Sequence, residues 1–198
     1  YKAVKSGISA REYEKKLSNS LSGKELINLW KDDFSKVAEA FSKADPKKRV
    51  KWGGPEMSAR SKITARHMET WAHGQEVFDA LGKDREEKDR IKNIVHMGVI
   101  AYGWTFVNRK LAIPEPTPYL ILNAPSGEVW QWNDKESSSK IEGTAVEFAQ
   151  VVTQVRNFAD TKLSITGEPA IEWMKYAQCF AGPPEDPPAK GTRYKVAS

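Results

Sequence analysis

Prolines at three alternate positions divide the sequence into two parts of different character. Pro114, Pro116 and Pro118 form an extended run, because proline fixes φ and lacks the backbone N–H that a helix needs. Apolar residues recur at helical spacing before this run, whereas short runs with an alternating apolar pattern follow it. We therefore predict an α+β protein in which strands occur only after Pro118. The predicted parts are a helical domain at residues 1–113, a small α/β domain at 114–184 and a tail rich in proline and charge at 185–198.

The first part is predicted to be mainly helical from Ser9 to about Arg109. Ser9 and Glu12 have the spacing of a capping box, which satisfies the free N–H groups at the start of a helix. Glycine, proline and N-capping residues set the other boundaries. The helices are expected over residues 9–21, from Ser22 or Gly23 to a break at Asp45-Pro46, over 58–81 and over 91–109, with a basic loop at 47–56.

The second part is predicted to combine a β-hairpin with two helices. Strands at 119–123 and 128–132 flank a turn at Pro125-Ser-Gly. Trp130 and Trp132 fall on one face of this hairpin, because side chains alternate along a strand. The remaining elements are expected to be a helix over 144–158, a strand over 163–166 and a helix over 168–180.

The helix expected over residues 58–81 carries a candidate metal site. Ser58 is a good N-cap for it, and Gly82 supplies the C-terminal stop. Glu69 and His73 lie only about 40° apart around its axis, because successive residues are about 100° apart. Apolar residues on most sides predict a largely buried helix, in which a carboxylate needs a partner. The pair can bind one ion together, or simply form a hydrogen bond between the two side chains.

Three segments of the chain carry a family resemblance. They are Trp52-Gly-Gly-Pro-Glu-Met-Ser-Ala-Arg-Ser61, Ala65-Arg-His-Met-Glu-Thr-Trp-Ala-His-Gly-Gln-Glu-Val77 and Ala181-Gly-Pro-Pro184. They resemble the maleylpyruvate isomerase-like, DinB-related family of metal-binding proteins, and the resemblance runs over nearly the whole chain. It implies an N-terminal DinB-like helical bundle followed by a small α/β domain similar to a sterol-carrier fold.

The resemblance also implies a set of metal ligands. In this family the Glu and His of the second segment bind the metal, which implies that Glu69 and His73 are ligands here. The family's third ligand is a His on an earlier helix, but no His precedes His67 and the chain begins at Tyr1. We therefore expect a further helix upstream of Tyr1 to carry that ligand, or His96 to complete the set. Candidates for substrate or outer contacts are His96, Arg60 and Trp52.

Better-known relatives in this family use the metal to activate a low-molecular-weight thiol. The resemblance thus implies two cofactors, a divalent metal such as zinc or nickel and a low-molecular-weight thiol, and a thiol-dependent isomerase or transferase that acts on a small thiol or electrophile. A bound divalent ion lowers the pKa of a thiol or water and polarises carbonyls. Two alternatives stay open. One is a non-catalytic metal or small-ligand binding module whose α/β domain mediates association, for example in a homodimer, and the other is a nucleic-acid-binding protein.

The composition bears on partners and compartment. The net charge of +5 comes mainly from scattered lysines with one cluster at 47–51, which is weak evidence for a nucleic-acid partner. No run approaches the roughly 18 apolar residues of a membrane span, so we predict a cytoplasmic protein without membrane contact.

The other histidines and the single cysteine are weaker candidates for chemistry. His67 points almost opposite to Glu69 on its helix and is a poor candidate ligand. His96 lies on a helix where a hydrogen-bonded core histidine is the more common case. Cys179 excludes a disulfide framework within the chain, and its apolar surroundings predict a buried, inert thiol.

Overall fold

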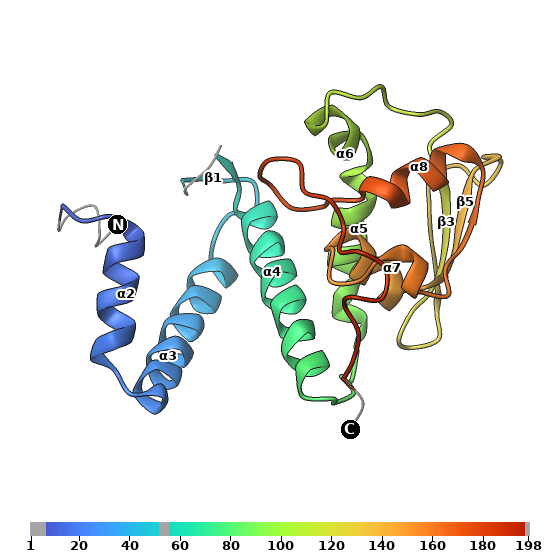
Figure 1. Cartoon of the computed structure of the whole chain (residues 1–198). Helices are drawn as coiled ribbons and strands as arrows, with labels where there is room; N and C mark the ends of the chain where they lie inside the picture. The colour runs from blue at the N-terminus through green and yellow to red at the C-terminus, as the bar shows by residue number, and fades with distance from the viewer. Residues whose placement is uncertain (1–6, 52–55, 197–198) are drawn as a thin grey trace. The chain divides into compact units, whose positions relative to one another are not determined.

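The computed structural model describes residues 7–51 and 56–196, apart from the side chain of Ala10. Trp52 therefore lies outside the described residues. The chain separates into two compact units, residues 1–60 and 61–198 (Figure 1). We refer to them as the N-terminal unit and the C-terminal unit and describe each by itself. Helices and small sheets both occur, so the prediction of an α+β fold is confirmed.

The N-terminal unit holds two capped helices. They are α2 (Ala10–Ser20) and α3 (Gly23–Ser42). Each begins with a full capping box, in which a serine and a glutamate three residues later satisfy each other's backbone N–H groups: Ser9 with Glu12, and Ser22 with Glu25. The predicted starts of both helices are thus confirmed, while α3 ends at Ser42, before the break expected at Asp45-Pro46.

A two-stranded pairing follows α3 and corrects one prediction. β1 (Arg49–Val50) pairs antiparallel with β2 (Met57–Ser58), so the expectation that strands occur only after Pro118 is wrong. These strands pair with each other and not with the later sheet. Strands of two residues are too short to produce an alternating pattern in the sequence. The sequence therefore predicted a loop over residues 47–56, where β1 lies.

Helix α4 (Ala59–Ala80) follows directly and ends where the sequence predicts. Gly82 adopts a φ of 62°, which only glycine adopts without strain. The N–H of Gly82 donates to the carbonyl of Asp79, and that of Lys83 donates to the carbonyl of Phe78. These two bonds form a Schellman motif and satisfy carbonyls at the helix end.

The burial of α4 differs from the prediction of a largely buried helix. Its fully buried residues within the C-terminal unit form one stripe at spacings of three and four: Met68, Trp71, Ala72, Gln75 and Asp79. Glu69 and His73 are exposed. Apolar residues on the other sides, such as Val77, lie at the surface, because only one stripe of a helix can face a single core.

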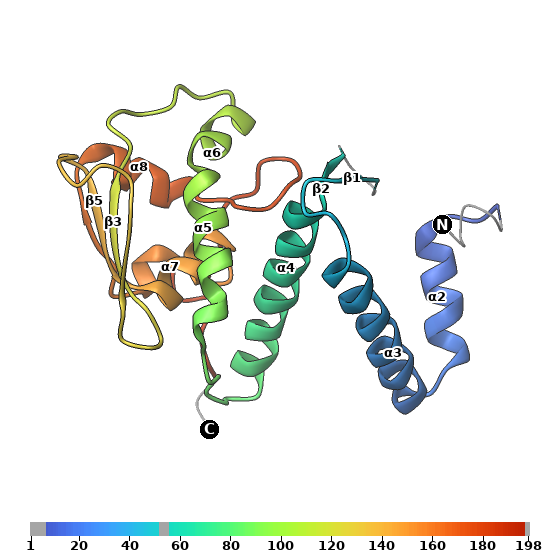
Figure 2. The same ribbon diagram turned by 180° about the vertical axis from the view of Figure 1, so that it is seen from behind.

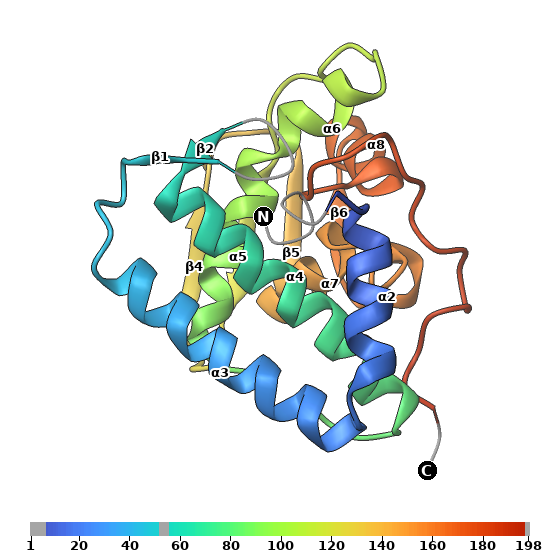
Figure 3. The same ribbon diagram turned by 90° about the vertical axis from the view of Figure 1, so that its left-hand side faces the viewer.

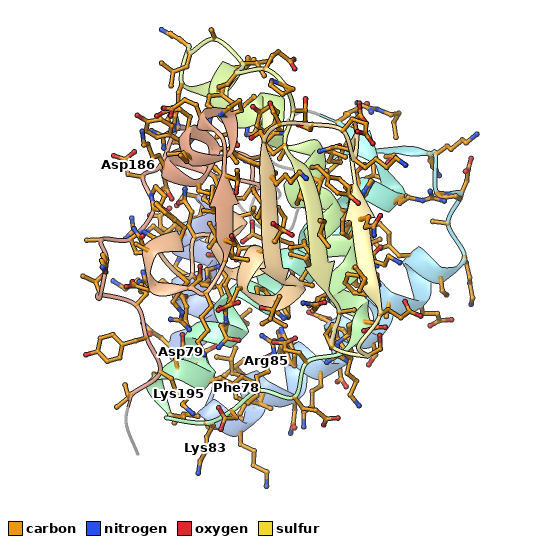
Figure 4. All side chains as sticks on the ribbon, turned by 90° about the vertical axis from the view of Figure 1, so that its right-hand side faces the viewer. Phe78, Asp79, Lys83, Arg85, Asp186 and Lys195 are labelled. Atoms are coloured by element: carbon orange, nitrogen blue, oxygen red, sulfur yellow. The ribbon has the colours of Figure 1, made fainter. Side chains whose placement is uncertain are left out.

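The C-terminal unit is built on a four-stranded sheet with the order β4-β3-β5-β6. The strands are β3 (Tyr119–Asn123), β4 (Val129–Trp132), β5 (Lys140–Thr144) and β6 (Ser164–Thr166). The predicted hairpin of β3 and β4 is confirmed, and Trp130 and Trp132 make an edge-to-face contact on it. Helices α5 and α7 of the C-terminal unit lie on one side of this sheet (Figures 1 and 2), and Figure 4 shows the sheet from the opposite side.

Strand β5 is absent from the sequence prediction. It pairs parallel with β3 and antiparallel with β6, so it occupies the centre of the sheet. Only Ile141 of its residues is fully buried, and Gly143 adopts a φ of 147° against Leu163. A strand with one buried apolar residue and a central glycine has little local signal, and its pairing with β3 defines it.

The helices of the C-terminal unit are shorter than predicted. The segment expected to be one helix over 91–109 forms a 3-10 turn (Asp89–Ile91), α5 (Lys92–Ile100) and α6 (Tyr102–Asn108). α7 (Ala145–Val152), a 3-10 turn (Phe158–Asp160) and α8 (Glu168–Tyr176) follow. α7 ends before the predicted residue 158. Gln154 adopts a φ of 58°, and the carbonyl of Val152 accepts a hydrogen bond from the N–H of Cys179 in place of a helical partner. No helix among the described residues is long and apolar enough to cross a membrane.

One hydrophobic core joins residues on both sides of the proline run. α5 packs against α7, and α6 packs against α8. Figure 3 shows α5 in front of the strands β4 and β5. The ring of Trp173 contacts Tyr102 and Phe148 edge to face, at centroid distances of 4.9 and 5.6 Å. The compact units divide after Arg60, whereas the sequence placed the domain boundary after residue 113.

The contact of Gly98 on α5 with α7 predicts the effect of one added methyl group. A Cβ on Gly98 would lie 2.7 Å from Cγ2 of Val152 and 3.1 Å from a ring carbon of Phe148. We expect Gly98→Ala to lower the free energy of unfolding by about 1–3 kcal/mol, because α5 must move away from α7. Gly103→Ala is the matched control, since its Cβ would meet only the flexible end of Ile113 at 3.4 Å. Urea denaturation measures the free energy of unfolding of both variants. Equal values for Gly98→Ala and Gly103→Ala would contradict the close packing of α5 against α7.

The shared core also predicts which fragments of the chain fold on their own. We expect residues 61–198 to unfold cooperatively on their own, because they retain the whole core. Residues 114–198 are expected to lack a cooperative transition, because they lose Ile94, Val95 and Phe106 from the core. Thermal denaturation followed by near-ultraviolet circular dichroism tests this. A cooperative transition of 114–198 would instead support a boundary after residue 113.

Candidate functional site

A cleft of about 450 Å³ lies within the C-terminal unit, beside α4. One wall is the exposed flank of α4, and the other is the chain that follows α7 and α8. The residues of the α4 wall are Met68, Glu69, Ala72, His73 and Glu76. The opposite wall includes Thr153 to Val155, Phe180 to Pro183, Glu185, Asp186, Pro188 and Arg193. The two candidate metal ligands therefore face one cavity.

The imidazole of His73 lies between two carboxylates of the same helix. Its Nε2 is 3.6 Å from Oε2 of Glu69, and its Nδ1 is 3.2 Å from Oε2 of Glu76. The three residues are spaced at i, i+4 and i+7, so one face of α4 presents them together. Both Glu69 and His73 are open to solvent, with side chains 51% and 75% exposed. The pair is accessible to a ligand without any unfolding.

Glu76 connects the imidazole to the opposite wall. Its Oε1 accepts a hydrogen bond from the Arg193 guanidinium, while its Oε2 faces His73. Burial alone would raise the pKa of Glu76, but the hydrogen bonds and charges of His73 and Arg193 outweigh burial and hold that pKa below its ordinary value. Glu76 is thus held ionised and orients the ring of His73.

The opposite wall is fixed by side chains that bind its backbone. The Gln154 amide donates to the carbonyls of Ala177 and Glu185. Arg109 binds the Asp186 carboxylate at 2.8 Å and the Glu185 carbonyl. The sequence predicts a tail from residue 185, and these bonds hold the start of that tail in a defined place. The wall is therefore preorganised.

Cys179 is buried, as predicted. Its side chain is buried and unpaired. Burial, with a smaller contribution from the Glu69 charge, raises the pKa of its thiol to about 12. A thiol with so high a pKa is protonated near neutral pH, and only the thiolate is a nucleophile or a metal ligand.

Within the C-terminal unit, His96 does not line the cleft. It is exposed on α5. Among the described residues, no group of three His, Cys, Asp or Glu side chains could hold a metal, so His96 does not complete a set with Glu69 and His73. Arg60 belongs to the N-terminal unit, where its N–H donates to the carbonyl of Pro46. His67 is half-buried, and burial together with Arg90 and Arg85 lowers its pKa.

Sequence reasoning missed Glu76 and Arg193. Glu76 has a local signal, because it follows His73 at the i+3 position on the same helix face. Arg193 has none, since 117 residues separate it from Glu76. Only the folded C-terminal unit brings them together.

Comparison with known proteins supports the family resemblance. Residues 3–78 match the family model of the mycothiol maleylpyruvate isomerase N-terminal domain, which confirms the resemblance over this stretch. The chain is also 37% identical over 166 residues to an uncharacterised protein of Mycobacterium tuberculosis strain CDC 1551 / Oshkosh, and equally to one of strain H37Rv. Each alignment covers 83% of this chain and 64% of the relative, so the chain spans less than two thirds of these relatives. No solved structure matches the chain.

The lowered pKa of Glu76 predicts a pH-dependent contribution to stability. Because the folded pKa lies below the unfolded value of 4.5, the ionised group stabilises the fold above that value, and the effect is lost as the pH falls through the folded pKa. We expect Glu76→Gln to lower the free energy of unfolding by at most about 1 kcal/mol at pH 7, since the site is partly exposed. The difference should shrink below pH 4.5. Urea denaturation across pH checks this, with Glu86→Gln, whose side chain is 84% exposed, as the control.

Proposed function

We propose that Glu69 and His73 form a divalent-metal half-site, and that this chain uses the ion in the manner of thiol-dependent isomerases or transferases. The observation that carries the proposal is the environment of His73. Its Nδ1 faces a carboxylate, while its Nε2 lies beside a second carboxylate on an open cleft. Histidines that bind metals through one ring nitrogen usually donate the other N–H to a carboxylate. Glu76 would have this role.

The spacing of the two donors fits an ion between them. Zinc binds imidazole and carboxylate donors at about 2.0–2.2 Å, so two ligands of one tetrahedral ion are separated by roughly 3.3–3.6 Å. Nε2 of His73 and Oε2 of Glu69 are 3.6 Å apart. The pair therefore fits two corners of such a site without a change in the helix. Zinc or nickel is the ion that we propose.

The described residues supply two ligands, so the remaining positions would go to other donors. The third ligand predicted upstream of Tyr1 remains a prediction. When bound, an ion of this kind lowers the pKa of a thiol or water. The thiol would be an external small molecule, because the only cysteine is buried and protonated.

The chain's own residues would orient and enclose this chemistry. Glu76 holds the imidazole of His73, and Gln154 and Arg109 fix the wall opposite α4. Phe180 and Ala181 give that wall apolar surface against which an uncharged part of a substrate could pack. A small thiol or electrophile is thus the proposed partner, and a cytoplasmic location remains a prediction.

The finer fold assignments belong to the same proposal. The family match over residues 3–78 supports the proposal that the N-terminal part of the chain is DinB-like. A sterol-carrier-like fold for residues 114–184 remains a proposal that rests on the sequence resemblance. The mixed sheet with helices on one side is compatible with it.

Metal stoichiometry tests the half-site. We expect the wild-type chain to bind one zinc or nickel ion weakly, because two protein ligands hold a divalent ion less tightly than three. Glu69→Gln and His73→Ala should each weaken binding at least about tenfold. His67→Ala and His96→Ala are the matched controls and should leave it unchanged, since neither residue lines the cleft. Equal binding by all five proteins in isothermal titration would reduce Glu69 and His73 to a structural pair.

Turnover distinguishes an enzyme from a binding module. The metal-loaded chain is incubated with a panel of small thiols and electrophiles, and product formation is compared with that of His73→Ala. Turnover that His73→Ala loses supports the isomerase or transferase. Metal binding without turnover favours the non-catalytic binding module instead.

A further inference from the structure

The last described residues form a strap along the acidic side of α4. We define the strap as residues 189–196. Arg193 binds Glu76, Lys195 binds Asp84 at 2.7 Å, and the N–H of Val196 donates to the carbonyl of Asp79 at 2.9 Å. Figure 4 shows the labelled Lys195 and Asp79 close to the C-terminal end of α4. The strap thus contacts α4 through the Arg193 ion pair and one backbone hydrogen bond, and beyond α4 it is held by the Lys195 ion pair and by the N–H of Gly191, which donates to the Asp160 carboxylate at 2.7 Å.

Arg193 places a fixed positive charge in the candidate metal cleft. It lines the same cavity as Glu69 and His73. Its partner Glu76 uses one oxygen for Arg193 and the other for His73. The guanidinium therefore already neutralises the carboxylate that would support a metal-bound imidazole.

The ion pair of Arg193 and Glu76 is exposed enough to break and re-form. The side chains of Arg193 and Glu76 are 49% and 35% exposed, so water and salt weaken their attraction. A divalent cation beside His73 would repel Arg193 and draw Glu76 toward the imidazole. The two cations thus oppose each other through one shared carboxylate.

We propose that Arg193 is an intramolecular competitor of the divalent ion, so that metal binding and strap binding to α4 weaken each other. This inference rests on the proposed function of Glu69 and His73. Coupling between two binding events is reciprocal, so the strap lowers metal affinity by the same factor by which the metal loosens the strap. Arg193 acts through Glu76 and is a positioning residue.

Three variants separate the charge of Arg193 from other effects. Arg193→Gln removes the cation from the cleft, Arg193→Lys keeps it, and Lys195→Gln removes a charge from the same strap outside the cleft lining. Zinc affinity is measured by isothermal titration on the full chain. We expect Arg193→Gln to bind zinc at least about fivefold more tightly than the wild type, whereas Arg193→Lys and Lys195→Gln change affinity much less.

Hydrogen exchange gives a second, structural measurement. The Val196 N–H is protected by its bond to Asp79 in the wild type. Saturating zinc should accelerate its exchange in the wild type, while Arg193→Gln should exchange quickly with or without zinc.

The outcomes separate this inference from the proposed function. Equal zinc affinity of wild type and Arg193→Gln, or an equal gain in Lys195→Gln, overturns the competition and leaves the half-site standing. Absence of zinc binding in every protein, including Arg193→Gln, overturns the half-site and the competition together.

Discussion

The burial of Trp71 fixes the rotation of α4, and the geometry of the cleft depends on it. The indole is almost fully buried, and its Nε1 donates to both carboxylate oxygens of Glu87. Arg85 covers the ring at 5.2 Å and donates to the carbonyl of Trp71 at 2.7 Å. Removal of a buried tryptophan typically costs about 3–5 kcal/mol. A rotation of α4 about its axis would expose Trp71 and break its contacts with Glu87 and Arg85. Glu69 and His73 therefore stay on the side of α4 that lines the cleft.

α4 takes part in one buried ion pair and one exposed ion pair, which differ in how much they stabilise the fold. Asp79 and Arg156 are 2.9 Å apart with side chains only 11% exposed, and Gln75 binds the same carboxylate. Breaking such a buried pair costs about 3–5 kcal/mol, whereas an exposed pair contributes about 1 kcal/mol or less. The pair of Glu76 and Arg193 is of the exposed kind. The buried pair anchors the helix, and the carboxylates near the cleft remain free to change partners.

The sequence predicted those features of the fold that depend on residues close together in the chain. The capping box of Ser9 and Glu12, the glycine stop at Gly82 and the hairpin of β3 and β4 all involve residues close in the chain. Strand β5 was missed, because its parallel partner β3 lies about 20 residues earlier and its own residues give little signal. The spacing of Glu69 and His73 predicted that their side chains lie on one side of α4, whereas their role as metal ligands was implied by the family resemblance and stays a prediction. Arg193 could not be predicted, because an ion pair across 117 residues exists only after folding.

The continuity of the core has a consequence for synthesis on the ribosome. Met68 and Cys179 belong to one hydrophobic cluster, and β5 reaches the sheet only after the proline run has been made. Because packing of this unit needs residues from both ends of that span, Met68 emerges from the ribosome long before Cys179, although Arg85 and Glu87, the partners of Trp71, follow soon after it. During this interval Met68 lacks part of its core. A nascent chain of this kind would present an apolar helix face to chaperones until the last helix, α8, has been translated.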